Sequence, residues 1–325
     1  MRIAIYGYGN LGKGVEVMAL KNPDMTLAGI FTRRDPSAIT PLTDAKVYPA
    51  SSVTEHRGDI DVMIICGGSA TDLPEMTPML ARDFSVVDSF DTHAKAAEHF
   101  RRVDAAAREG GNLALISAGW DPGMFSLARA YANAVMPGGE AYTFWGRGVS
   151  QGHSDAIRRI PGVRDARQYT VPVEEALQAV RGGGHPSLSV REKHRRECWV
   201  VAEEGADLSA IEKAIVTMPY YFDEYYTEVN FITQEELIRD HSGLPHGGSV
   251  IYTAESGMGG EHAHSIEYSL KLDSNPEFTA GVLIACARAV GRMAQRGMTG
   301  CVTMFDVAPG DLSPLSAEEL RNSML

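Results

Sequence analysis

Residues 2–12 read RIAIYGYGNLG, and this stretch decides the fold of the first part of the chain. It opens with five residues of β-type, largely apolar character, and a helical pattern follows over residues 10–21. Between them, Gly7, Gly9 and Gly12 have the GxGxxG spacing of a turn that brings a dinucleotide's pyrophosphate onto a helix N-terminus. We therefore predict a Rossmann-type dinucleotide-binding unit; a purely structural glycine turn is the alternative.

Strand and helix patterns continue to alternate up to about residue 116. Such alternation is typical of an α/β, doubly wound parallel sheet with helices on both faces. The predicted strands are 26–32, 61–66, 85–88 and 112–116, and the predicted helices are 71–82 and 93–109.

From about residue 140 the pattern changes to longer strands with few helices between them. A run of strands with few crossovers predicts a second, α+β domain built on a mostly antiparallel sheet. A glycine-rich loop is predicted over 182–189, and a long helix over 277–296 packs back on the first domain or on a partner subunit. The predicted strands are 142–145, 168–171, 198–201, 227–232, 250–253 and 265–272, and the shorter helices are 174–181 and 207–217.

The composition excludes several classes of protein. A length of 325 residues suggests two domains, and the net charge of −12 disfavours a nucleic-acid partner. The four cysteines form no CxxC pair, so neither a zinc site nor a disulfide framework is indicated. The first residues enter a strand directly, and no apolar stretch reaches the ~20 residues of a membrane span, so we expect a cytoplasmic protein without a membrane partner.

A basic pair lies where NAD-binding proteins carry an acidic residue, about 20 positions after the glycines. Thr32, Arg33 and Arg34 offer a hydroxyl and two guanidinium groups, which suit the 2′-phosphate of NADP. A solvated pair of surface arginines is the alternative, and Asp35 follows directly. The sequence thus favours NADP over NAD.

Polar, aromatic and small residues gather at loop positions farther along the chain. Residues 66–71 follow a predicted strand and suit a cofactor contact, although a plain turn is the alternative. Residues 88–93 and 119–123 also follow predicted strands of the first sheet and could position a substrate near the nicotinamide. Similar segments occur at 144–155 and 243–248.

Long strings of this sequence are similar to one known family. They include GYGNLG, FTRR, GGSATD, VDSFDTH, SAGWDPGMFS, FWGRGVSQGHSDAIRRIPGV, GLPHGG and EYSLKLDSNPEFTA. Over essentially its whole length the chain resembles the meso-diaminopimelate dehydrogenase family. The resemblance implies NADP-dependent oxidation of the D-centre of meso-2,6-diaminopimelate to an imine and then a ketone, with release of ammonium, by a homodimer.

The resemblance also implies which residues bind the two ligands. The implied cofactor contacts are Tyr8, Gly9, Asn10, Leu11, Thr32, Arg33, Arg34, Cys66, Gly67, Gly68, Ser69, Ser89, Phe90, Asp91, Ala118, Gly119, Trp120, Asp121, Pro122 and Asn275. The implied substrate contacts are Asp91, Trp120, Asp121 and Trp145 at the reacting end, Gln151, Gly152, Asp155, Thr170, Arg196 and His246 at the distal end, and Asn275, which closes the pocket.

These side chains suit a substrate with two zwitterionic ends. Asp91 and Asp155 can accept hydrogen bonds from ammonium groups, while Arg196, Thr170 and His246 can donate to a carboxylate. Both ends need recognition, because otherwise the meso isomer could not be distinguished from the L,L and D,D isomers.

A carboxylate near the reacting nitrogen would assist deprotonation or activate water. Asp91 is our first candidate for this catalytic role and Asp121 the second. Each has a structural alternative, since both aspartates could cap the helices that follow them. Trp120 and Trp145 could likewise be core residues.

Two other kinds of site are not favoured. His153 lies between Ser150 and Asp155, but no GxSxG turn accompanies them, so a hydrolase triad is not predicted. His262 and His264 lack a neighbouring Cys or carboxylate cluster, so no metal is expected.

With the resemblance, the chain divides into four segments. We expect residues 1–118 to bind the dinucleotide, with 273–325 packing back on them or at the dimer interface. Residues 119–150 would connect the domains and take part in dimerisation, and residues 151–272 would form the substrate and dimerisation domain.

Two other functions stay open. One is another NADP-dependent reductase of lysine-pathway intermediates, similar to dihydrodipicolinate reductase, which would not require ammonium. The other is a non-catalytic NADPH-binding regulator, which would show no turnover.

Overall fold

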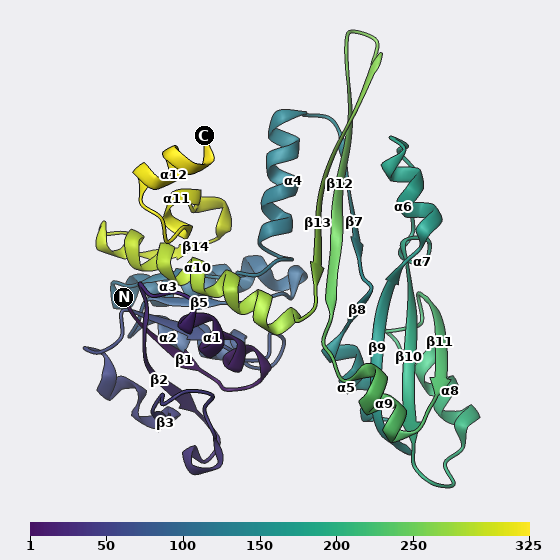
Figure 1. Cartoon of the computed structure of the whole chain (residues 1–325), viewed down its shortest axis with the longest axis horizontal. Helices are drawn as coiled ribbons and strands as arrows, with labels where there is room; N and C mark the ends of the chain where they lie inside the picture. Colours follow the sequence, from purple (N-terminus) through teal and green to yellow (C-terminus); the bar gives the residue numbers. More distant parts are fainter. The chain divides into compact units, whose positions relative to one another are not determined.

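The computed structural model describes residues 1–325, which form two compact units. Unit 1 consists of Met1–Leu127 and Pro276–Leu325, and unit 2 consists of Ala128–Asn275 (Figure 1). No helix in either unit is both long enough and apolar enough to cross a bilayer.

Unit 1 is built on a seven-stranded sheet with the order β14-β6-β5-β4-β1-β2-β3. Every neighbouring pair of strands is parallel, which confirms the predicted parallel sheet. Two of the strands, β3 and β14, were not expected; β3 ends in a proline and β14 begins with a glycine, and both residue types are disfavoured in strands. The strands are β1 (Arg2–Tyr6), β2 (Thr26–Thr32), β3 (Val47–Pro49), β4 (Val62–Ile65), β5 (Val86–Asp88), β6 (Leu113–Leu115) and β14 (Gly300–Val302).

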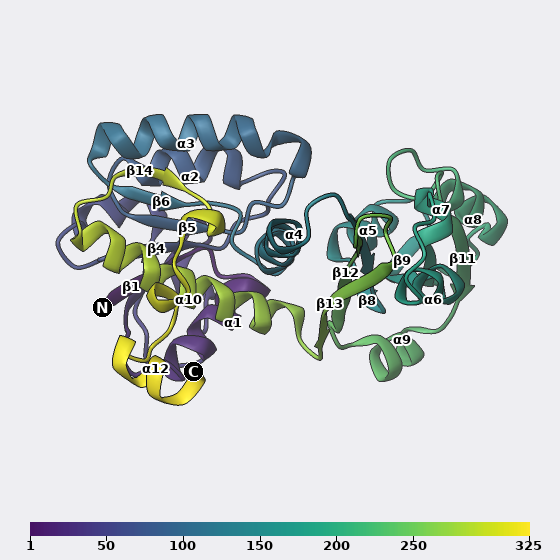
Figure 2. The same cartoon turned by 90° about the horizontal axis from the view of Figure 1, so that it is seen from above.

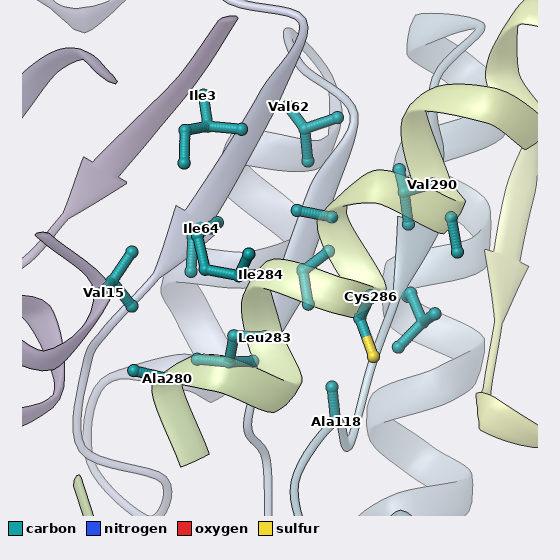
Figure 3. Close-up of a cluster of buried hydrophobic side chains, with 14 of the residues drawn as sticks. Ile3, Val15, Val62, Ile64, Ala118, Ala280, Leu283, Ile284, Cys286 and Val290 are labelled. Carbon is teal, nitrogen blue, oxygen red and sulfur yellow. The ribbon is translucent and has the colours of Figure 1, made fainter. Parts of the chain in front are cut away.

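Helices cover both faces of this sheet (Figure 2). Successive residues of β1 alternate between two cores: Ile3 and Ile5 lie in the core with α1 and α10, and Ala4 and Tyr6 lie in the core with α2 and α3. Figure 3 shows α10 in the first of these cores, with Leu283 and Ile284 among the side chains of the strands. The helices are α1 (Asn10–Leu20), α2 (Leu73–Ala81), α3 (Ala96–Gly110) and α10 (Asn275–Gln295).

Shorter helices complete unit 1. They are the 3₁₀ turns η1 (Pro36–Ala38), η2 (Ala50–His56), η3 (His93–Lys95) and η4 (Met304–Asp306), and the C-terminal helices α11 (Pro309–Leu312) and α12 (Ala317–Met324). The predicted helix over 93–109 therefore begins as the 3₁₀ turn η3 and continues as α3.

Unit 2 contains two sheets. The four-stranded sheet has the order β11-β10-β9-β8, and the three-stranded sheet has the order β13-β12-β7. All pairs are antiparallel except β10 with β11, so the prediction of a mostly antiparallel arrangement is confirmed. In the three-stranded sheet, β12 is the central strand and pairs with β13 on one side and with β7 on the other. In the four-stranded sheet, β8 is an edge strand and pairs with β9.

Five strands of unit 2 extend beyond the predicted ranges, β11 has the predicted length but begins and ends one residue earlier than expected, and β8 was not expected. The strands are β7 (Glu140–Trp145), β8 (Gly148–Val149), β9 (Val163–Pro172), β10 (His194–Ala202), β11 (Tyr226–Phe231), β12 (His246–Ser256) and β13 (His262–Leu272).

The helices of unit 2 are short, and several carry side-chain caps. Ser150 caps α5, and Thr233 forms a reciprocal capping box with Glu236 at the start of α9. Neither helix was expected, although the T-x-x-E spacing is a sequence signal for the second. The helices are α5 (Gln151–Arg158), α6 (Glu174–Arg181), α7 (Val190–Lys193), α8 (Leu208–Val216) and α9 (Gln234–His241), and α4 (Met124–Val135) runs across the boundary at residue 127.

A buried arginine of α10 holds the C-terminal part of unit 1 to its N-terminal part. The Nε and Nη2 atoms of Arg288 donate to the carboxylate of Asp24 at 2.6 and 2.9 Å. The guanidinium also donates to Asn22 Oδ1 and to the carbonyl of Leu312. Only 4% of the Arg288 side chain is exposed. Because water does not solvate the guanidinium, these partners must stabilise its charge.

We predict that Arg288→Met lowers the free energy of unfolding by about 2 kcal/mol at pH 7, because it removes the charge-assisted hydrogen bonds between a buried guanidinium and the Asp24 carboxylate, whose side chain is 36% exposed. The hydrogen bond from Arg288 lowers the pKa of Asp24. A carboxyl group whose folded-state pKa is lowered stabilises the fold above its unfolded pKa of about 3.9, and this stabilisation is lost as the pH falls through the folded pKa.

Urea unfolding of both proteins from pH 7 down to pH 3 tests this prediction. The difference between them should shrink below about pH 4. A difference that stays constant with pH would assign the stability loss to packing rather than to the ion pair.

Candidate active site

The glycine turn between β1 and α1 fits the approach of a phosphate group. Gly7 has φ +98°, and a Cβ atom there would lie 2.9 Å from the carbonyl oxygen of Cys66. A Cβ atom on Gly12 would lie 2.3 Å from the carbonyl oxygen of Gly7, so only glycine permits this close packing of helix on turn. Gly9 is the N-cap of α1, and a Cβ atom there would meet nothing within 4 Å. No side chain caps α1 and no acidic residue lies in its first turn, so its N-terminus suits an anion.

The basic pair lies at the end of β2, beside this turn. Arg34 Nη2 donates to the carbonyl oxygen of Tyr8, and the main-chain N–H of Arg34 donates to Thr32 Oγ1 at 3.1 Å. Arg33 Nη2 lies 2.7 Å from Asp72 Oδ1, and 61% of the Arg33 side chain is exposed. A guanidinium carries five donor hydrogens, so both arginines keep donors for a phosphate.

A buried carboxylate that the sequence analysis missed orders the residues around Tyr8. Glu16 of α1 accepts hydrogen bonds from the Tyr8 hydroxyl, from the main-chain N–H of Leu42 at 3.1 Å and from that of Thr43 at 2.8 Å. Burial opposes the ionisation of Glu16, but these donors outweigh it and lower its pKa. Burial, together with Glu16, raises the pKa of Tyr8 to about 12. The Tyr8 ring and the 42–43 segment are thereby fixed next to the arginine pair.

The loops after β4 and β5 meet at the carboxyl edge of the sheet. Ser69 Oγ accepts a hydrogen bond from the main-chain N–H of Asp91 at 2.8 Å. The Asp91 carboxylate is exposed, accepts no hydrogen bond from the chain and caps neither η3 nor α3. The capping alternative for Asp91 is therefore wrong, and its carboxylate is available to a ligand. Burial raises the pKa of the Cys66 thiol, which keeps it protonated and unreactive.

Trp120 and Asp121 follow β6 at the same edge. Trp120 is 8% exposed and makes an edge-on contact with Phe125, with ring centroids 5.3 Å apart. It is thus mostly a packing residue that leaves a small surface for contact. Asp121 is half-buried.

In unit 2, the sheet brings Arg196 and Thr170 together as neighbours on β10 and β9. Arg196 Nη1 donates to Thr170 Oγ1, and its guanidinium carbon lies 3.9 Å from the ring centroid of Tyr225. Arg196 is 7% exposed and forms no ion pair with any carboxylate of the chain; its Nε atom is buried without a partner. Burial lowers its pKa, although a guanidinium stays charged at neutral pH. A buried cation without a counter-ion is a strong candidate for binding a carboxylate. Sequence reasoning missed Tyr225, because nothing in its local sequence indicates stacking.

Two histidines of unit 2 are neutral. Burial lowers the pKa of His246, and its Nδ1 lies 2.8 Å from the main-chain nitrogen and 3.1 Å from the carbonyl oxygen of Gly247, so the neutral ring has one N–H to donate. Burial, followed by the charge of Arg196, lowers the pKa of His194 to about 3. The His194 ring stacks on Trp145, with centroids 5.1 Å apart.

The segment at the start of α5 differs in part from expectation. The carboxylate of Asp155 is paired with Arg158 on the same helix, so it is not an unpaired acceptor for an ammonium group. Ser150 contacts His153 Nδ1 at 2.7 Å as part of the helix cap, and no acid completes a triad. Gln151 and Gly152 lie exposed in the first turn of α5, and Asn275 donates its main-chain N–H to the carbonyl oxygen of Leu244.

Comparison with known proteins gives consistent results over the whole chain. Residues 119–274 match the family model described as the diaminopimelic acid dehydrogenase C-terminal domain. The meso-diaminopimelate D-dehydrogenase of Lysinibacillus sphaericus is 55% identical over 325 residues, which cover 100% of this chain and 99% of that protein. The protein of the same name from Corynebacterium glutamicum is 48% identical over 320 residues and 98% of each chain.

Two solved structures match this chain over its whole length. The C. glutamicum DAP dehydrogenase in complex with DAP superposes with a TM-score of 0.93 at 47% identity, covering 100% of this chain and 99% of that chain. An engineered D-amino acid dehydrogenase bound to NADP⁺ gives a TM-score of 0.88 at 46% identity, with the same coverage.

The basic pair yields a prediction about cofactor choice. Replacing Arg33 and Arg34 together by Ala removes charge-assisted hydrogen bonds worth roughly 1.5–3 kcal/mol each, so the affinity for NADP should fall at least about tenfold. NAD affinity should change little, because NAD lacks the 2′-phosphate. Fluorescence titration with both cofactors checks this, and equal losses for the two would assign the arginines to the fold or to the adenine.

Proposed function

Because the chain belongs to the meso-diaminopimelate D-dehydrogenase family, we propose that it catalyses the reversible, NADP-dependent oxidative deamination of the D-centre of meso-2,6-diaminopimelate. The products are L-2-amino-6-oxopimelate, which cyclises to tetrahydrodipicolinate, and ammonium, in the biosynthesis of diaminopimelate and lysine. The structural observation that carries this proposal is the buried, uncompensated guanidinium of Arg196, which suits a substrate carboxylate. The reductase and regulator alternatives are not favoured, since relatives with this one activity in their names match the chain from end to end.

Unit 1 supplies the cofactor site. The α1 N-terminus suits the pyrophosphate, Arg33 and Arg34 suit the 2′-phosphate, and the loop ends at 66–69 and 118–122 suit the nicotinamide half. When bound, NADP⁺ accepts the hydride that leaves the D-centre carbon. The residues of the chain bind and orient the reactants and handle the protons.

At the reacting end, Asp91 accepts a hydrogen bond from the amino group and takes part in its deprotonation. Its exposed carboxylate has no partner in the chain, and its backbone is fixed by Ser69. Loss of the hydride and of a proton from nitrogen leaves an imine; water then adds to the imine carbon, and ammonium leaves as the ketone forms. Asp121 is the second candidate for this proton transfer. Trp120, in the same loop, and Trp145 of unit 2 are the aromatic residues that we assign to substrate binding.

At the distal end, Arg196, Thr170 and His246 bind the second carboxylate. The Thr170 hydroxyl accepts from Arg196 and keeps its own proton to donate, and the His246 ring supplies a further N–H donor. Gln151, Gly152 and Asn275 complete this set.

We further propose that the enzyme is a cytoplasmic homodimer without nucleic-acid or membrane partners. Reducing conditions suit its four unpaired cysteines. The apolar side chains that unit 2 exposes support dimerisation: Tyr131 is 74% and Val135 55% exposed on α4, and Ile266 and Tyr268 are partly exposed on β13. We assign residues 1–118 and 273–325 to the dinucleotide-binding domain, 119–150 to the connection and the dimer interface, and 151–272 to substrate binding and dimerisation.

The proposed function is tested by NADPH formation with meso-, L,L- and D,D-diaminopimelate side by side. Only isomers with a D-centre can react, and the meso isomer should be preferred because its distal end is the L-centre. In the reverse direction, consumption of NADPH should require ammonium. Reduction without ammonium would indicate a reductase of another kind, and cofactor binding without any turnover would indicate a regulator.

We predict that Arg196→Met lowers kcat/KM for meso-diaminopimelate by roughly 30-fold to several thousand-fold, because the substrate carboxylate loses its buried partner, at a cost of about 2–5 kcal/mol. D-amino acids with apolar side chains should be affected less. Arg195→Met is the matched control, since Arg195 is half-exposed and pairs with Glu197. Normal turnover by the Arg196 variant would show that another group binds the carboxylate.

We predict that Asp91→Asn lowers kcat by about 10²–10⁴-fold and leaves NADP binding nearly unchanged, because it keeps the shape and removes the proton acceptor. Steady-state kinetics and a separate measurement of the cofactor dissociation constant check this. A kcat near that of the wild type would move the role to Asp121, and a loss confined to KM would make Asp91 a binding residue only.

A further inference from the structure

A second aspartate of unit 1, Asp88, lies fully buried at the end of β5, three residues before Asp91. Its Oδ1 atom accepts the main-chain N–H of Phe90 at 3.0 Å and that of Ser117 at 2.9 Å. These two donors belong to different loops, one after β5 and one after β6. One carboxylate oxygen therefore ties together the segments that carry both candidate catalytic aspartates.

The other oxygen of Asp88 is held by two helices on the α2–α3 face of the sheet. Thr77 of α2 donates its hydroxyl to Oδ2 at 2.7 Å, and His99 of α3 places its Nε2 at 2.7 Å from the same atom. The Nδ1 atom of His99 is buried without a partner, so the proton is on Nε2, where it has an acceptor. With four donors, all the acceptor positions of the Asp88 carboxylate are used.

His99 also contacts the reacting-end loop directly. Its ring stacks on Phe90 with centroids 4.1 Å apart and an angle of 17° between the planes. Across the loop, Ser117 has φ +57°, a left-handed conformation that is costly for serine, and the Asp88 carboxylate bonds to its N–H. The main-chain N–H of Ala118 donates to the Asp88 carbonyl at 2.9 Å. The side chain and main chain of Asp88 thus fix successive residues of the β6 loop.

We propose that the buried pair Asp88–His99 is a positioning unit for the reaction: it holds the loops that carry Asp91 and Trp120–Asp121 in their reactive arrangement. Neither residue touches the reactants; both act through the main chain of Phe90, Ser117 and Ala118. The expected effect on kcat rests on the proposed function. The effect on the order of the two loops does not, and it can be measured on a protein of any activity. Small displacements of reacting groups lower rates steeply, so such a unit should affect kcat more than binding.

The test compares His99→Leu with His99→Gln. Leucine removes both the N–H donor and the stacked ring, whereas glutamine restores an N–H near the position of Nε2. We expect His99→Leu to lower kcat by about 10- to 100-fold, with the NADP dissociation constant within about twofold of wild type, and His99→Gln to recover most of the loss. Arg288→Met is the control for stability alone, because it removes a buried interaction of unit 1 elsewhere; at a temperature at which all variants are folded, its kcat should equal that of wild type.

Hydrogen–deuterium exchange provides a readout that does not depend on activity. In His99→Leu, peptides covering 88–92 and 116–121 should exchange about tenfold faster or more, because Asp88 loses one of the donors that hold its carboxylate in place between the two loops. Peptides from β1 should be unchanged. If those loop peptides exchange as in wild type, or if kcat falls equally in the Leu and Gln variants, the positioning role is overturned. A wild-type enzyme that turns over no diaminopimelate isomer would refute the proposed function instead, and the exchange rates would still decide whether the pair holds the loops.

Discussion

The carboxyl ends of seven parallel strands share one edge of the sheet in unit 1, and the chemistry of that unit depends on this constraint. Parallel pairing brings the loops after β1, β4, β5 and β6 to the same edge, although they are separated by more than a hundred residues in sequence. The edge is closely packed, since Gly7 approaches the carbonyl of Cys66 too closely for any side chain. Side chains then set the finer geometry: Glu16 fixes Tyr8, Ser69 fixes Asp91, and Asp88 joins the β5 and β6 loops.

The main feature of unit 2 is a buried positive charge, that of Arg196, which no carboxylate of the chain neutralises. Arg196 is held by a threonine hydroxyl and the face of a tyrosine, and these neighbours orient the guanidinium without neutralising it. The nearby carboxylate of Glu197 is engaged by Arg147 and Arg195. Arg196 therefore attracts an anion. Burial lowers the pKa of His194 and His246, so Arg196 carries the positive charge among these three residues.

The sequence predicted much of the fold, because buried parallel strands are continuous apolar runs and their helices have clear periods. Strand 26–32 and helix 174–181 agree with the structure at both ends. The division of unit 2 into two sheets was not predictable, since strand pairing is decided by contacts distant in sequence.

The site was predictable where residues form local motifs, as in the glycine turn and the arginine pair. Asp88, Glu16 and Tyr225 were missed because their roles depend on partners distant in sequence: Thr77 and Ser117 lie 11 and 29 residues from Asp88, Leu42 lies 26 residues from Glu16, and Arg196 lies 29 residues from Tyr225. The Asp155–Arg158 pair was accessible from its i, i+3 spacing on a helix.

Unit 1 is discontinuous in sequence, and this has a consequence for the order in which the chain folds during synthesis. The core on the α1 face includes Leu283, Ile284 and Val290 of α10, and the sheet ends with β14 at residues 300–302. The first 127 residues therefore cannot complete their core until almost the whole chain has left the ribosome. Unit 2 is continuous from Ala128 to Asn275, so all of its strands are available earlier. The segment made first is thus the last to reach its final packing, and its apolar strands stay open to aggregation until α10 and β14 have been made.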